Sequence, residues 1–192
     1  MRFMAVWWVM SMVLLGGCAS TPVSYSSNTL NASPLTTFEV DGRLVVHSVH
    51  KSGQLGFHWT HHPSDDVVTF YSPLGQTLAV LTLNVTGASL VDGSGKVQHA
   101  DSMETLSDKS LGWTFPLAEL SYWIVGAADP NETFIIGRDE AHPEQLQLSQ
   151  SGWVVTYLRW RQQGHRNLPD KLSFLGAGVS ARLVVSHWGE AK

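Results

Sequence analysis

Cysteine is almost absent from this chain, which has one such residue, Cys18, among 192. A lone thiol forms no intramolecular disulfide and supplies no cysteine cluster for a metal ion. Charged residues are also scarce, at 15% of the chain, where a typical soluble domain has about 25%. Acidic residues outnumber basic ones, and the formal net charge is −4. Because nucleic-acid-binding proteins carry a clustered basic surface, we expect no nucleic-acid partner.

The chain also lacks the motifs of several enzyme classes. No glycine-rich loop followed by Lys-Ser/Thr is present to cradle a nucleotide phosphate. Residues 48–51 read Ser-Val-His-Lys, but the companion motifs of acyl-serine enzymes are missing. Among nine histidines, His58, His61 and His62 cluster around Trp59. On a strand His58 and His61 point to opposite faces, so they do not converge on one ion. The sequence therefore predicts no catalytic residue, no metal site and no cofactor.

Only one long apolar run occurs, from residue 3 to residue 15, behind a basic start. It is shorter than the roughly 20 residues that a membrane-spanning helix needs. A charged start, a short apolar stretch and then small residues are typical of a secretory signal. Leu-Gly-Gly-Cys at residues 15–18 resembles the lipobox of bacterial lipoproteins, whose cysteine is acylated and becomes the first mature residue. We therefore expect residues 1–17 to be a lipoprotein signal peptide and Cys18 to carry the lipid anchor.

The residues after Cys18 bear on location and domain organisation. Stable anchoring takes two lipid signals, and the cysteine of a bacterial lipoprotein typically carries three acyl chains. Ala19 follows, and by resemblance to enterobacterial lipoproteins the absence of aspartate there favours the outer membrane. Removing residues 1–17 removes one basic and no acidic residue, which makes the net charge −5. Residues 18–36, rich in Ser, Thr, Asn and Pro, are predicted to be the acylated cysteine and a flexible tether, and residues 37–192 a single domain.

Apolar alternation predicts a mainly β domain with some helix. Six strands are expected first, two short helices follow, and four strands complete the chain; the ranges are 38–46, 55–59, 67–71, 77–84, 88–91 and 96–100, then 102–106 and 116–126, then 144–150, 153–161, 171–175 and 181–187. This order indicates a curved antiparallel sheet or barrel with helices against it. From Leu78 to Leu83 the fourth strand is apolar on both faces except at Thr82, so we expect another element to cover its outer face.

One loop and one set of aromatic residues are candidates for function. Pro73 and Gly75 mark a turn that places Leu74 near a loop tip. That leucine either folds back onto the sheet or dips into lipid. The aromatic residues either fill an ordinary core or line an apolar cavity, and composition alone does not distinguish the two; they are Phe57, Trp59, Phe70, Trp113, Trp123, Trp153 and Trp160.

Taken in order, several segments resemble the outer-membrane lipoprotein receptor LolB family over nearly the whole mature chain. They read DGRL at 41–44, SPLGQT at 72–77, LGW at 111–113, PLxxLxxWIxG at 116–126, SGWxVxY at 151–157, and Trp188. The resemblance implies an unclosed antiparallel β-barrel of the LolA/LolB type, covered by helices and enclosing a hydrophobic cavity. It also implies that the chain faces the periplasm, accepts lipoproteins from the carrier LolA and inserts them into the outer membrane. The family's loop leucine maps onto Leu74, whereas residues 127–143 and 176–178 depart from the pattern.

Such a transfer makes and breaks no bond. Each buried methylene is worth about 0.8 kcal/mol, so exposing a sixteen-carbon chain costs roughly 10 kcal/mol or more and the chains must pass directly between apolar cavities. The expected cavity lining includes Phe57, Trp59, Phe70, Leu78, Val80, Trp113, Leu120 and Trp123, and the expected membrane-inserting loop is Pro73, Leu74 and Gly75. The partners are then LolA, acylated lipoprotein cargo and outer-membrane lipids, with the receptor acting as a monomer. The alternatives are a membrane-anchored lipid-modifying or metal-dependent hydrolase and a structural assembly lipoprotein with a filled core.

Overall fold

The computed structural model describes residues 30–31, 33–49, 52–111 and 116–189. This part of the chain forms one antiparallel sheet of eleven strands and two short helices. In chain order the elements are β1 (Phe38–Ser48), β2 (Ser52–His62), β3 (Asp65–Tyr71), β4 (Thr77–Asn84), β5 (Gly87–Asp92), β6 (Val97–Ala100), α1 (Met103–Leu111), α2 (Leu117–Ile124), β7 (Phe134–Arg138), β8 (Leu146–Gln150), β9 (Trp153–Gln163), β10 (Arg166–Gly176) and β11 (Val179–Gly189). The prediction of a mainly β, unclosed antiparallel fold with covering helices is confirmed.

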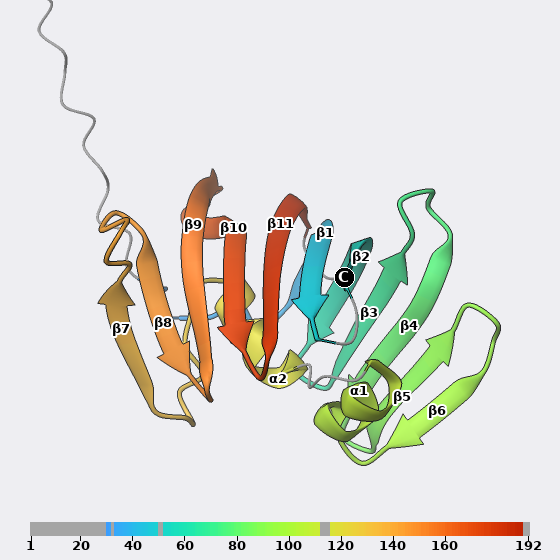
Figure 1. The fold of residues 1–192 in the computed structure, drawn as a ribbon. Helices are drawn as coiled ribbons and strands as arrows, with labels where there is room; N and C mark the ends of the chain where they lie inside the picture. Colours follow the sequence, from blue (N-terminus) through green and yellow to red (C-terminus); the bar gives the residue numbers. More distant parts are fainter. Residues whose placement is uncertain (1–29, 32, 50–51, 112–115, 190–192) are drawn as a thin grey trace, which may run out of the picture.

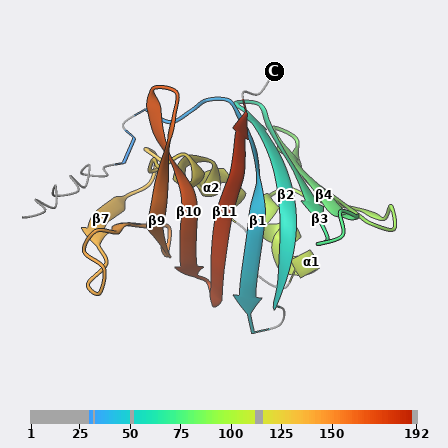
Figure 2. The ribbon, with the colours of Figure 1, turned by 90° about the horizontal axis from the view of Figure 1, so that it is seen from above.

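The sheet curls around the two helices without closing. Its strand order is β6-β5-β4-β3-β2-β1-β11-β10-β9-β8-β7, so the first strand of the domain pairs with the last. β6 and β7 form the two edges. Figure 1 shows α1 in front of β5 and α2 behind β10 and β11, and Figure 2 also shows α2 behind these strands. Both helices therefore lie on the concave face.

Alternating side chains explain why the core lies on that face. In β1 the apolar residues at every second position are buried, among them Phe38, Val40 and Leu44. Successive strand residues point to opposite faces of a sheet, so these side chains all enter the concave side. Gly42 continues the series, and a Cβ there would lie 2.5 Å from the Val184 carbonyl oxygen and 2.6 Å from the Phe57 ring. This glycine lets the Phe57 ring lie against the sheet.

Two sequence expectations differ from the structure. β7 was not expected; all five of its residues are exposed and show no alternation of burial. The expected cover over the outer face of β4 is also wrong, because α1 packs instead against β5 and β6 with Met103 and Leu106 buried in the core. As a result, Leu78 on that outer face is 42% exposed.

The segment before β1 is attached to the domain at several points. The backbone N–H of Asn31 donates to the Gly126 carbonyl at 2.7 Å, and its side-chain amide donates to the Val125 carbonyl at 2.6 Å. Leu30 and Leu35 pack against the core. The predicted boundaries at residues 17 and 36 stay predictions. Neither helix in the described part of the chain is long or apolar enough to cross a membrane.

Candidate functional site

An apolar cavity lies between the concave face of the sheet and α2. It is narrow and partly open to solvent, with room of about 40 Å³ for the centre of a water molecule. The walls come from β1–β3 on one side and β9–β11 on the other, and Leu120 and Trp123 of α2 cover it. The described lining residues are Leu44, Phe57, Trp59, Val68, Phe70, Pro116, Leu120, Trp123, Trp153, Phe174, Val179, Ala181 and Leu183. None of these side chains carries a carboxyl, imidazole, hydroxyl or amine group.

The structure brings five of the eight predicted lining residues together around this cavity, namely Phe57, Trp59, Phe70, Leu120 and Trp123. Trp113 lies outside the described residues. Leu78 and Val80 are a correction, because they project from the outer face of β4. Val80 pairs with Thr69, whereas the inward-facing Phe70 pairs with Ala79.

The expected lining list left out the residues contributed by the second half of the chain, although Trp153 was among the aromatic candidates. Trp153, Phe174, Val179, Ala181 and Leu183 belong to β9–β11. Their alternation was visible in the sequence. Their position opposite Phe57 and Trp59 depends on the pairing of β1 with β11, for which the sequence carries no local signal.

The covering helix α2 is held mainly at its C-terminal end. The indole N–H of Trp123 donates to Gln150 Oε1 at 2.8 Å, and the Tyr157 hydroxyl donates to the Trp123 carbonyl at 3.2 Å. Burial raises the pKa of Tyr157 well above its ordinary value, so this hydroxyl stays a donor. Gln150 also accepts from the Asp129 N–H and donates to its carbonyl, which ties the segment after α2 to β8. The exit of α2 is thereby fixed to the sheet.

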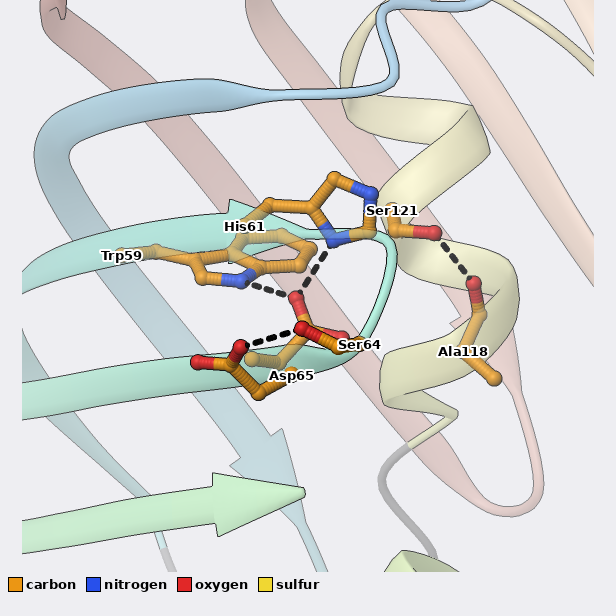
Figure 3. Close-up of polar contacts among 7 residues, drawn as sticks. Trp59, His61, Ser64, Asp65, Ala118 and Ser121 are labelled. Carbon is orange, nitrogen blue, oxygen red and sulfur yellow. Dashed lines mark hydrogen bonds and ion pairs between the residues drawn. The ribbon is translucent and has the colours of Figure 1, made fainter. Parts of the chain in front are cut away.

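A buried carboxylate supports one wall of the cavity. Asp66 Oδ1 accepts a hydrogen bond from the indole N–H of Trp59 at 2.7 Å and lies 2.7 Å from Nδ1 of His61 (Figure 3). The His61 ring stacks on Phe38 at a centroid distance of 4.7 Å. This network fixes the indole of Trp59, which lines the cavity.

The clustered histidines are placed on different faces. Whereas His61 lies inside beside Asp66, His58 lies on the outer face, 2.8 Å from Asp41. The described residues contain no group of three or more His, Cys, Asp or Glu side chains arranged to hold a metal ion. His58 and His61 each have a carboxylate partner, on opposite faces of the sheet.

The β3–β4 loop presents Leu74 to solvent on a well-ordered turn. Two backbone hydrogen bonds of Ser72 close the loop. Its N–H donates to the Gln76 carbonyl at 2.8 Å, and its carbonyl accepts from the Gly75 N–H at 2.9 Å. Gly75 has a φ of +83°, which favours glycine. Leu74 is 89% exposed, so its side chain does not fold back onto the sheet.

Comparison with known proteins agrees with this architecture. The family model "Outer membrane lipoprotein LolB" matches residues 36–188. An outer-membrane lipoprotein LolB of Nitrosomonas europaea is 31% identical over 198 residues, covering 96% of this chain and 93% of that protein. One from Shewanella baltica is 29% identical, covering 93% and 85%. A crystal structure of a LolA superfamily protein from Nitrosomonas europaea shares the fold, with a TM-score of 0.51 at 10% identity over 83% of this chain and 88% of that one. The chain therefore belongs to the outer-membrane lipoprotein LolB family.

Proposed function

We propose that this outer-membrane lipoprotein receptor, anchored through acylated Cys18 and facing the periplasm, takes the acyl chains of lipoprotein cargo from the carrier LolA into its own cavity. It then releases them into the outer membrane. The observation that carries the proposal is the wholly apolar lining beneath α2. Water is a poor solvent for such a surface and for acyl chains alike, which favours direct passage from cavity to cavity.

The same lining favours a receptor over the alternatives. A lipid-modifying or metal-dependent hydrolase needs a nucleophile, a general base or a metal beside its substrate, and the described lining offers none of these groups. An assembly lipoprotein with a filled core needs no empty space between facing walls. Family membership and cavity together favour a lipoprotein receptor.

The narrow cavity implies that the cover moves when cargo enters. Three acyl chains need more room than the closed walls leave. The hydrogen bonds of Trp123 and Gln150 hold the C-terminal end of α2, so we expect its N-terminal end, near Pro116, to swing away. The sequence has no phosphate-cradling motif through which a nucleotide would drive the transfer. Direction comes from affinity, which increases from carrier to receptor to bilayer.

The direct test mixes carrier loaded with acylated cargo with this receptor and follows the cargo by pull-down. We expect the cargo to move to the receptor without any added nucleotide. The same preparation also reports the oligomeric state, which we expect to be monomeric. If the cargo stays on the carrier under all conditions, the proposed function is wrong.

Leu74 is proposed to enter the lipid during release. Leu74→Glu places a charge at the loop tip without touching the cavity, so uptake from the carrier should stay normal while delivery to outer-membrane vesicles falls at least several-fold. Val85→Glu is the matched control, because Val85 is 91% exposed at the opposite end of β4. Normal delivery by the Leu74 variant would refute this role for the loop.

A further inference from the structure

The outer face of β4–β6 carries apolar side chains that no described helix covers. Leu78 is 42% exposed and Val97 is 51% exposed. Val80 and Val91 lie between them, half-buried, in one cross-strand row, since Val80 pairs with Val91 and Val91 with Val97. We call these four residues, Leu78, Val80, Val91 and Val97, the outer apolar patch.

The outer apolar patch has a sharp boundary along the strands. The next row on the same face, two residues further from the Leu74 end, consists of Thr82, Ser89 and His99. The surface thus changes from apolar to polar within one step of the sheet, roughly 7 Å. A boundary of this kind across three strands is what a surface needs in order to sink partly into a bilayer, because interfacial apolar faces bury about 5–10 Å into the lipid.

The patch is continuous with the Leu74 loop. Thr77 begins β4 directly after that loop, and the Gly93 N–H donates to the Leu78 carbonyl at 2.8 Å, which holds the β5–β6 turn beside the start of β4. Figure 1 shows the β3–β4 loop and the β5–β6 turn projecting from the same side of the sheet. The turn carries one acidic and one basic residue, Asp92 and Lys96. Ser94 donates to Asp92 Oδ1 from its N–H at 2.9 Å and from its hydroxyl, so this carboxylate has local partners.

We propose that the outer apolar patch is a second membrane contact, which lies on the lipid of the outer membrane when Leu74 inserts. The bound surface is then a corner of the sheet, and the sheet meets the bilayer with β4–β6 facing the lipid. This proposal rests on the proposed role of Leu74 and extends it from one side chain to an oriented surface. It also accounts for the apolar outer face of β4, which the sequence predicts to be covered.

The test uses the acylated protein in vesicles of phosphatidylethanolamine and phosphatidylglycerol. Cys18 is the only cysteine and its thiol is consumed by the anchor, so an introduced cysteine is the single labelling site. Leu78→Cys and Val97→Cys are labelled with a polarity-sensitive fluorophore and exposed to lipids that carry a quenching spin label. His99→Cys is the matched control, on the same strand and face as Val97 but in the polar row. Val85→Cys controls the far end, and Leu74→Cys reports the loop.

We expect several-fold stronger quenching at positions 78 and 97 than at 99 and 85. Equal, weak quenching at all four positions would overturn the proposal. If position 74 is quenched in that case, only the second contact fails; if it is not, the proposed role of the loop fails as well. A label at 78 or 97 that shifts to the blue without quenching by lipid also overturns the proposal, because protein then covers the patch, either a second copy or the chain's own tether.

Discussion

At the scale of single residues, close approaches decide the shape of the cavity. The ring of Phe57 lies on Gly42, and this contact leaves no room for a methyl group because the backbone oxygen of Val184 is also near. An aromatic wall therefore depends on a glycine from the neighbouring strand.

We predict that Gly42→Ala destabilises the protein by about 1–3 kcal/mol, the usual cost of overpacking, and displaces Phe57 into the cavity. Chemical denaturation followed by tryptophan fluorescence measures the stability, and binding of an apolar fluorescent probe measures the space. Gly53→Ala is the control, since nothing lies within 4 Å of a Cβ there. If both variants unfold at the same denaturant concentration, the crowding at Gly42 is without consequence.

Asp66 is the second residue on which the wall depends. Asp66→Ala leaves the indole N–H of Trp59 without its acceptor, and a buried donor without a partner costs about 1–3 kcal/mol. We expect a lower midpoint of urea unfolding and a changed tryptophan emission spectrum, because the surroundings of Trp59 change. Asp65→Ala is the control. It removes the neighbouring carboxylate, which accepts a hydrogen bond only from the exposed Ser64 hydroxyl among the bonds described, and it should leave the unfolding midpoint nearly unchanged. Equal losses in both variants would contradict this account.

At the scale of elements, α2 carries a carboxyl group where ionisation is unfavourable. Burial raises the pKa of Glu119, and the charges of Glu104, Asp129 and Glu132 add to the effect. Within the described residues, Glu119 Oε2 has no hydrogen-bond partner. The folded state therefore holds this proton more tightly than the unfolded state, and the group's contribution to stability is lost as pH rises through its raised pKa.

Glu119→Gln should accordingly raise the melting temperature at pH 7 and make no difference below about pH 4, where an ordinary glutamate is protonated. The gain should stay below about 1 kcal/mol, because water screens this half-exposed group. Thermal unfolding at the two pH values measures it, with Glu140→Gln as the exposed control. A gain that is the same at both pH values would contradict the raised pKa.

Elements with regular alternation could be predicted from the sequence, and irregular ones could not. The strands containing Phe38, Trp59 and Val155 were found because apolar residues recur at every second position over a buried face. β7 was missed because Phe134, Ile135 and Ile136 form an unbroken apolar run on an exposed edge.

The sequence does not indicate which side chains of β4 point into the cavity and which point outward. A bulge between Phe70 and Tyr71 shifts the register of the β3–β4 hairpin, and a strand that is apolar on both sides gives no sign of which side is inside. Leu78 and Val80 were therefore placed in the cavity, although they lie outside it. Leu74 was predicted at a loop tip because proline and glycine specify the turn through local geometry alone.

At the scale of the whole molecule, the cavity exists because two halves of the sheet face each other. Ala181 of β11 lies on its wall, and its small side chain leaves space that a larger one would fill. The neighbouring Ser180 points outward and is exposed.

We predict that Ala181→Phe reduces cargo uptake from the carrier at least several-fold while the fold stays intact, because the ring occupies the volume that the acyl chains need. Circular dichroism checks the fold and the pull-down assay checks uptake. Ser180→Phe adds the same ring on the other face and should take up cargo normally. Unimpaired uptake by the Ala181 variant would mean that acyl chains bind elsewhere.

The pairing of β1 with β11 also has a consequence for how the molecule is made. Residues 38–48 find their second partner only in residues 179–189, so nearly the whole polypeptide must be exported before the centre of the sheet can form. Until then β1 has an open edge, which another chain can occupy. Pairing over such a distance along the chain is slow. We therefore expect newly exported molecules to require protection from aggregation, and truncation of the last strand to abolish folding rather than merely shorten the sheet.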